Sequence, residues 1–300
     1  MGQALHNRKL GTLLIIISAT GFAFLAIFVK YAYAAGLNTL TMLSIRFLIA
    51  AVIMWVIVWA RKENPRIDRK KIVQLAMLGV MGYGVMSGFY FNAVNLVPAA
   101  IASIILYTYP LLVTLLAAWM FKEAITRTKL LSLVISSLGL VMVVGVAFDG
   151  LNPKGLLYAA MAAVVYSLYI VYSNKLVGRV NPMLVTTYVI TSAAVVLTLI
   201  TLVSGSVVLP TGSQGWWSLL GIAVFSTVIA ILTFFQGMSI VGPSQASIIS
   251  TLEPVVTALA AFLLLAEKVS VTQFLGGLLV IGAVILIQKD EEVIVSEQKG

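Results

Sequence analysis

Residues 90–123 read YFNAVNLVPAAIASIILYTYPLLVTLLAAWMFKE, and residues 234–267 read FFQGMSIVGPSQASIISTLEPVVTALAAFLLLAE. The two stretches align without a gap at a constant shift of 144 residues. Identical residues at that shift include Phe91/Phe235, Val97/Val241, Ala102/Ala246, Ser103/Ser247, Ile104/Ile248, Ile105/Ile249, Pro110/Pro254 and Glu123/Glu267. The same shift pairs Gly11 with Gly155 near the start of each half. The chain is therefore an internal duplication whose unit is nearly half its length, too long for a stacked solenoid repeat.

The composition is that of a membrane protein. Hydrophobic residues make up 61% of the chain and charged residues 10%, and the mean hydropathy is +1.09, whereas soluble domains contain about 25% charged residues. The net charge of +9 comes from short basic clusters between apolar runs, a pattern that favours a membrane topology over a nucleic-acid partner. The chain has no cysteine, its one histidine is His6, and it has no GxxxxGK stretch. We therefore expect no metal, no cofactor, no catalytic residues and no enzyme activity.

Ten apolar runs follow one another along the chain, and most are close to the ~20 residues that a helix needs to cross the hydrocarbon core. They span approximately 11–33, 40–60, 72–94, 99–121, 130–147, 155–176, 182–203, 216–240, 245–266 and 272–288. The sequence predicts an all-α integral membrane protein of ten transmembrane helices. The expected parts are a first five-helix repeat over 1–148, a second over 149–289 and a cytoplasmic tail over 290–300.

Lys and Arg are distributed unevenly between the two sides that ten crossings define. The side of the amino terminus holds fifteen of them, Arg8, Lys9, Arg61, Lys62, Arg66, Arg69, Lys70, Lys71, Lys122, Arg127, Lys129, Lys175, Arg179, Lys289 and Lys299, and the other side holds three, Lys30, Lys154 and Lys268. Basic residues accumulate on the cytoplasmic side, so both termini are predicted to be cytoplasmic in a multi-pass protein of the cell's inner membrane. Five is an odd number of crossings, so the second repeat is inverted relative to the first, as in proteins that work by alternating access.

Two prolines interrupt the repeated hairpins at equivalent places. Pro110 and Pro254 fall near the middle of the fourth and ninth apolar runs, where each ring removes a backbone donor and frees a carbonyl. A simple kink is the plain interpretation of one such proline. Two at related depths indicate broken helices that line a cavity and shape moving hairpins.

Polar and aromatic side chains recur around these prolines and at the matching sites of the other runs. The candidates for the wall of a substrate cavity are Tyr90, Asn92, Tyr107, Tyr109, Tyr166, Tyr169 and Gln236. The alternative is ordinary packing and interhelical hydrogen bonding.

Two formal charges lie well inside the apolar runs. Glu253 is about eight residues, or roughly 12 Å, from the cytoplasmic end of its run, and an intramembrane carboxyl is a candidate for binding a cationic group or carrying a proton. A neutral Glu hydrogen-bonded to a broken helix is the structural alternative. Arg46 lies roughly 9 Å from the external end of its run. It either extends to the headgroups, or faces the bundle as a charge partner of Glu253 or of an anionic substrate group.

The two hairpin sequences together, with IRFLIAAV around Arg46 and the stretch 21–30 of the first run, resemble the EamA-like branch of the drug/metabolite transporter superfamily. The resemblance covers nearly the whole chain. It implies a ten-helix inverted-repeat fold and export of small metabolites, amino acids among them, across a bacterial-type inner membrane. The chain departs from the family pattern at Thr20, where many members carry Trp, and at Asn38 and Thr39, where many carry a proline.

These observations together predict a secondary transporter that exports small organic metabolites such as amino acids by alternating access. The expected partners are a small-molecule substrate, the lipid bilayer and protons as a candidate coupling ion, and the sequence leaves the oligomeric state open. A passive channel or facilitator and a proton-coupled uptake permease are the alternatives. Symmetric repeats occur in channels as well as in carriers.

Overall fold

The ten apolar runs fold into helices, and most helix ends lie within a few residues of the expected positions. A computed structural model of the chain describes residues 2–145, 152–265 and 268–297, and the side chains of 7–145, 152–265 and 268–288. Its elements are α1 Gly2–Ala34, α2 Thr39–Ala60, α3 Arg69–Gly79, η1 Val80–Val85, α4 Met86–Val94, α5 Ala99–Leu106, α6 Tyr109–Phe121, α7 Arg127–Val144, α8 Pro153–Val177, α9 Pro182–Val203, α10 Ser213–Ala223, η2 Val224–Ile229, α11 Ala230–Val241, α12 Pro243–Ser250, α13 Leu252–Leu265 and α14 Val271–Glu297.

The described part of the chain holds ten helical spans long and apolar enough to cross a membrane. Their outer surfaces are apolar as well: Val203 is 88% exposed, Trp59 82% and Trp119 80%. Soluble proteins rarely expose apolar patches on this scale. The chain is a multi-pass membrane protein, and lipid covers these side chains.

The same irregularities recur in both halves. The third span contains a π-helical segment, η1, at 80–85, and the eighth contains η2 at 224–229, which is the same place at the shift of 144. The fourth span is divided into α5 and α6, and the ninth into α12 and α13. Because α5 ends at 106 and α12 at 250, the expected break next to each repeated proline is present in both hairpins.

The first helix of each half packs against the third and fourth spans of the other half. Helix α1 contacts α10, η2, α11, α12 and α13, and α8 contacts η1, α4, α5 and α6. The contacts correspond residue by residue: a Cβ on Gly11 would meet Val241 Cγ1 at 2.7 Å, and a Cβ on Gly155 would meet Val97 Cγ1 at 2.7 Å. Glycine is required at both places because the two backbones approach so closely. The packing is that of two corresponding five-helix units that interlock.

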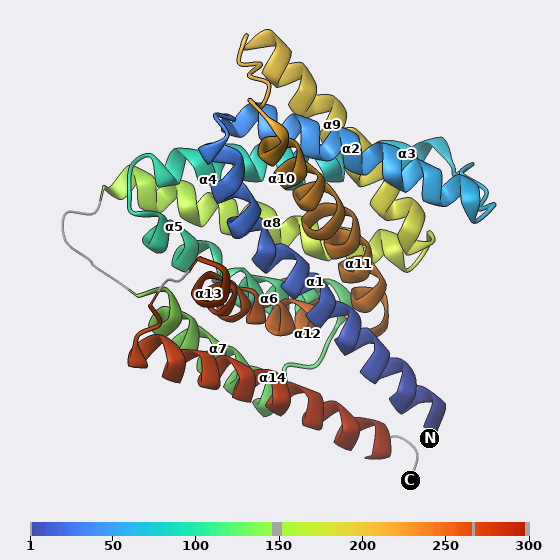
Figure 1. The fold of residues 1–300 in the computed structure, drawn as a ribbon. Helices are drawn as coiled ribbons and strands as arrows, with labels where there is room; N and C mark the ends of the chain where they lie inside the picture. Colours follow the sequence, from blue (N-terminus) through green and yellow to red (C-terminus); the bar gives the residue numbers. More distant parts are fainter. Residues whose placement is uncertain (1, 146–151, 266–267, 298–300) are drawn as a thin grey trace.

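Two further contacts join helices that occupy the same position in the two halves. Helices α2 and α9 lie together, as do α7 and α14, which run along one edge of the molecule in Figure 1. The Ser44 hydroxyl of α2 donates a hydrogen bond to the Leu197 carbonyl of α9 at 2.9 Å. Between α7 and α14, a Cβ on Gly139 would lie 2.6 Å from the Gly276 carbonyl. These pairs form the seams between the two halves.

Some boundaries differ from the sequence prediction. Helix α1 begins at Gly2, before the first apolar run, and α14 continues to Glu297, through most of the segment expected as a tail. Charged residues such as Lys and Glu have high helix propensity, so a helix continues past the point where its sequence stops being apolar. The expected boundary at 148/149 and the repeated Glu267 lie outside the described residues.

Candidate functional site

The repeated prolines begin new helices instead of bending continuous ones. Pro110 lies in the first turn of α6, after a turn at Tyr107 and Thr108, and Pro254 lies in the first turn of α13, after a turn at Thr251. The first turn of a helix tolerates proline because its amide donors have no partner inside the helix. Both hairpins therefore present a helix start within the membrane.

Glu253 occupies the first turn of α13. A helix start favours a negative charge through the helix dipole, whereas the membrane interior disfavours it. The Tyr107 hydroxyl, from the break in the other hairpin, lies close enough to the Glu253 carboxyl to interact with it. The two broken helices thus meet at this side chain.

Tyrosines surround Glu253. The carboxyl interacts electrostatically with Tyr90, Tyr107, Tyr109 and Tyr166, which come from α4, from the break before α6, from α6 and from α8. The Tyr90 and Ser103 hydroxyls share a hydrogen bond at 2.8 Å, and Tyr109 interacts with Ser250 of α12. Both halves of the chain contribute to this group.

The aromatic rings continue from Glu253 towards Arg46 as one series. Ring centroids are 4.8 Å apart between Tyr109 and Tyr166, 6.0 Å between Tyr166 and Tyr169, and 5.8 Å between Tyr169 and Tyr83. The last step joins Tyr83 to Phe47 at 4.8 Å. We call this series, Tyr107, Tyr109, Tyr166, Tyr169, Tyr83 and Phe47, the aromatic series.

Arg46 lies at the far end of the aromatic series. Its guanidinium carbon is 4.7 Å from the centre of the Phe47 ring, a distance typical of a cation–π contact. The residue is only 5% exposed, so its side chain does not reach the headgroups. Its Nε is buried without a hydrogen-bond partner. Arg46 and Glu253 form no ion pair with each other.

Two of the expected cavity residues lie apart from this group. Asn92 is exposed and its side-chain amide donates to the Gly88 carbonyl of its own helix at 2.8 Å. Gln236 is half-buried on α11. The structure brings Tyr90, Tyr107, Tyr109, Tyr166, Tyr169 and Glu253 together, and neither carboxamide is among the groups that interact electrostatically with Glu253.

Sequence reasoning missed Phe47, Ser250 and Phe235. Phe47 covers the Arg46 guanidinium, and Ser250 interacts with Tyr109. The centroids of the Phe235 and Tyr169 rings are 6.2 Å apart. The position of Phe47 directly after the buried arginine was the one available signal. The other two residues were hidden because their partners come from distant helices.

A separate groove of about 440 Å³ runs along the outside of the bundle. It is lined by α2 side chains alone, Leu48, Ala51, Val52, Trp55, Val56 and Trp59. Its lining is apolar and contains neither Glu253, nor Arg46, nor any of the tyrosines. The groove therefore faces lipid and is no part of the candidate site.

Comparison with known proteins agrees with the fold and the duplicated hairpins. The sequence model of the EamA-like transporter family matches residues 9–145 and again 153–288. An uncharacterized transporter of Archaeoglobus fulgidus is 28% identical over 94% of this chain and 99% of its own. The aromatic amino acid exporter YddG of Ancylobacter novellus is 29% identical over 60% of this chain and 63% of its own. A crystal structure with 23% identity has a TM-score of 0.80 and covers 92% of this chain and 96% of that one. The chain belongs to the EamA-like transporter family of the drug/metabolite transporters.

Proposed function

We propose that this protein is a secondary transporter, and not an enzyme, that exports small organic solutes such as amino acids by alternating access. The two repeats, 1–148 and 149–289, stand inverted to each other with both termini in the cytoplasm, and the substrate chamber lies between them. Its wall comprises the aromatic series, Tyr90 and Glu253, with Asn92 and Gln236 at its margins. Pro110 and Pro254 shape the hairpins that move.

The observation that carries this proposal is a difference in burial between corresponding elements. All eight residues of α12 are buried, whereas in its counterpart α5 only Ile101 and Ala102 are. Helix α11 buries seven residues and its counterpart α4 buries Ala93 alone. Two copies of one sequence pattern are therefore packed at one end of the molecule and loose at the other. A carrier in one of its two alternating states has this property.

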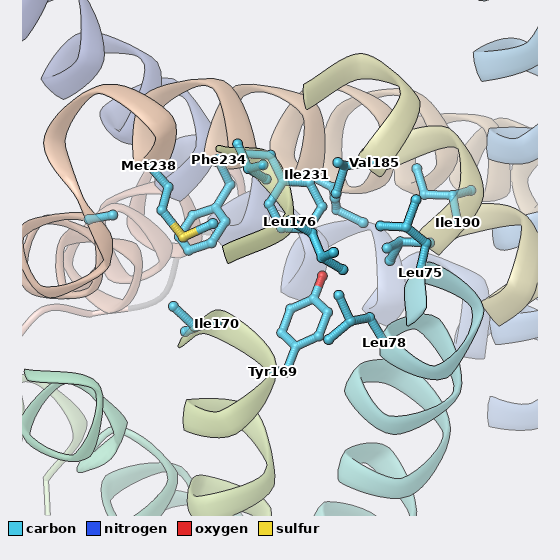
Figure 2. Close-up of a cluster of buried hydrophobic side chains, with 14 of the residues drawn as sticks. Leu75, Leu78, Tyr169, Ile170, Leu176, Val185, Ile190, Ile231, Phe234 and Met238 are labelled. Atoms are coloured by element: carbon cyan, nitrogen blue, oxygen red, sulfur yellow. The ribbon is translucent and has the colours of Figure 1, made fainter. Parts of the chain in front are cut away.

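The packed end contains the larger part of the hydrophobic core. Figure 2 shows side chains from α3, α8, α9 and α11 in this cluster, among them Leu75, Leu176, Val185 and Met238. They lie near the start of α3, the end of α8, the start of α9 and the end of α11. The α2–α3 and α8–α9 connections at this end, with the helix ends beside them, carry eight of the nineteen basic residues, Arg61, Lys62, Arg66, Arg69, Lys70, Lys71, Lys175 and Arg179. We therefore infer that the packed end is cytoplasmic and the loose end external.

The direction and substrate class rest on the relatives and on the ring-rich wall. One relative is named an aromatic amino acid exporter, and aromatic rings that meet edge to face or stacked, as Tyr109 and Tyr166 do, provide a surface that also suits an aromatic solute. A half-buried carboxyl at the end of that surface suits proton coupling.

Counterflow in proteoliposomes tests the proposal. Vesicles loaded with a high concentration of unlabelled L-phenylalanine or L-leucine should accumulate the labelled compound transiently and saturably, because a carrier exchanges solute faster than it returns empty. Protein-free vesicles give the baseline. Flux that rises linearly with concentration and shows no counterflow would establish a channel instead, and accumulation that requires an inward proton gradient would establish an uptake permease.

A further inference from the structure

The positive charge of Arg46 has no negatively charged partner among the side chains that the structure describes. The residue is 5% exposed and its Nε is buried without a partner, and the guanidinium forms no ion pair among the residues whose side chains are described. Its contacts are the Phe47 ring and the neighbouring Tyr83. An arginine stays protonated in proteins, so it cannot neutralise itself as a buried carboxyl does.

None of the described acidic side chains, Glu63, Asp68, Glu123 and Glu253, pairs with it. Of the ten acidic residues, Glu253 alone lies in the interior of a described span, and the aromatic series separates it from Arg46. Glu63 and Asp68 belong to the connection between α2 and α3, and Glu123 follows α6. The others fall in the connection after α7, the connection before α14 and the segment from 290 onward. The missing anion therefore comes from outside the protein.

A carboxylate matches the chemistry of this place. The guanidinium fork binds both carboxylate oxygens at once, and a charged pair in a place shielded from water is strengthened by the low dielectric. The Phe47 and Tyr83 rings, 4.8 Å apart, provide an apolar and aromatic surface next to the charge. The Tyr83 ring also meets the Tyr169 ring edge to face, with centroids 5.8 Å apart, and this contact packs the Tyr83 ring from the side of α8.

Resting on the proposed function, we propose that Arg46 binds the carboxylate of the transported solute, with the Phe47 and Tyr83 rings against the adjoining part of the molecule. The same solute head group does not reach Glu253. Three ring-to-ring steps of 5.8, 6.0 and 4.8 Å separate Tyr83 from Tyr109, whereas the amine and carboxylate of an α-amino acid are two bonds apart. The site consequently selects an acid group and does not require an amine.

Four probes with the same benzyl group distinguish binding of the carboxylate of an amino acid from binding of its amine. They are L-phenylalanine, 3-phenylpropanoate, L-phenylalaninamide and phenethylamine, and each is added at the same concentration to the purified protein while its melting temperature is measured. A ligand that binds the folded state raises that temperature. The two carboxylates should raise it, and the two compounds without a carboxylate should not. Sodium chloride at the same concentration gives the baseline for an inorganic anion.

Variants of Arg46 assign the selectivity to this residue. Arg46→Gln should lose the carboxylate shift, and Arg46→Lys, which keeps the charge without the fork, should retain a reduced shift. The melting temperature of ligand-free Arg46→Gln should equal or exceed that of the wild type, because an unpaired buried charge destabilises the fold. A merely structural arginine would instead lower it.

Four thermal-shift results would overturn the proposal. The first two are protection of the wild type by the amide and the amine as strong as that by the acids, and protection by none of the four probes. The other two are protection by chloride as strong as that by the acids, and carboxylate selectivity that survives in Arg46→Gln. Counterflow of L-phenylalaninamide at the rate of L-phenylalanine would reject the Arg46 site while leaving the carrier function intact.

Discussion

Glu253 is held between two influences of opposite sign. The start of α13 favours its ionised form and the membrane interior favours its neutral form, while the Tyr107 hydroxyl, from the other half, interacts with the carboxyl. A group balanced in this way exchanges a proton when its surroundings change. This is the property that proton coupling requires.

Glu253→Gln should therefore remove the pH dependence of transport. The glutamine side chain keeps the shape of the carboxyl but binds no proton, so the rate of counterflow should no longer depend on pH. Counterflow of wild type and variant is compared across a series of pH values. Glu63→Gln, which removes a carboxyl outside the spans, is the control. Unchanged transport and unchanged pH dependence in a normally inserted Glu253→Gln protein would end the proton or cation role.

Individual site residues were predictable where they contrast with their surroundings. Glu253 and Arg46 stand out as charges within apolar runs, and the tyrosines stand out by size and polarity. Their partners were not predictable. Ser250 meets Tyr109 and Phe235 meets Tyr169 only through the packing of helices distant in the chain, and a one-dimensional pattern holds no information on such contacts.

At the scale of elements, the duplicated breaks decide the geometry of the site. The prolines predicted the division of the fourth and ninth spans, since a proline in the interior of a helix removes a hydrogen bond and clashes with the preceding turn. The π-helical segments η1 and η2 were not foreseen. Neither contains a proline, and such a segment depends on one residue's difference in hydrogen-bonding register, which tertiary packing selects.

The close approach of α1 to α11 and of α8 to α4 gives a matched pair of predictions. Gly11→Ala and Gly155→Ala should each lower stability, by about 1–3 kcal/mol for an overpacked contact, because each new Cβ would lie 2.7 Å from a valine methyl. Gly282→Ala on α14, where nothing lies within 4 Å, is the control and should be neutral or slightly stabilising. Thermal unfolding in one detergent checks all three. An effect at only one of the two glycines would contradict the reciprocal packing.

A contact at the packed end links the two hairpins. The Ser244 hydroxyl, at the start of α12, donates a hydrogen bond to Glu123 Oε2 at 2.5 Å, and Lys129 Nζ lies 3.3 Å from the same oxygen. The first-half residue that corresponds to Ser244 is Ala100, which has no hydroxyl to donate. The loose end therefore has no equivalent of this bond.

Ser244→Ala should shift the protein towards the state open at the packed end. Hydrogen bonds to charged groups contribute about 1.5–3 kcal/mol, so the population of that state should rise roughly tenfold or more. Ser247 is 0% exposed, so a cysteine at this position reports opening of the packed end. The measurement is the rate at which a maleimide modifies Ser247→Cys alone and Ser247→Cys combined with Ser244→Ala. Ser239→Ala, whose hydroxyl bonds only its own helix, is the control. Equal rates in all three proteins would show that the bond does not hold this end closed.

At the scale of the whole molecule, hydropathy was sufficient for the class and the count of spans, and the resemblance of the two hairpin sequences was sufficient for the family. The number of spans follows from length and apolarity alone. The interlocking of the halves does not, because it depends on which faces of the helices are complementary, as at Gly11 and Gly155. The sequence also does not show which end is packed. The two repeats have similar sequence patterns, so the two alternating conformations differ little in free energy.

The inverted arrangement itself is the central claim, and side-specific labelling tests it most directly. The chain has no cysteine, so Lys70→Cys, in the first turn of α3, and Lys154→Cys, in the first turn of α8, each introduce a single exposed thiol. On intact cells, a membrane-impermeant maleimide should label Lys154→Cys and not Lys70→Cys, and permeabilised cells should label both. Labelling of both thiols from the same side of the intact membrane would contradict the inversion and the alternating-access account that depends on it.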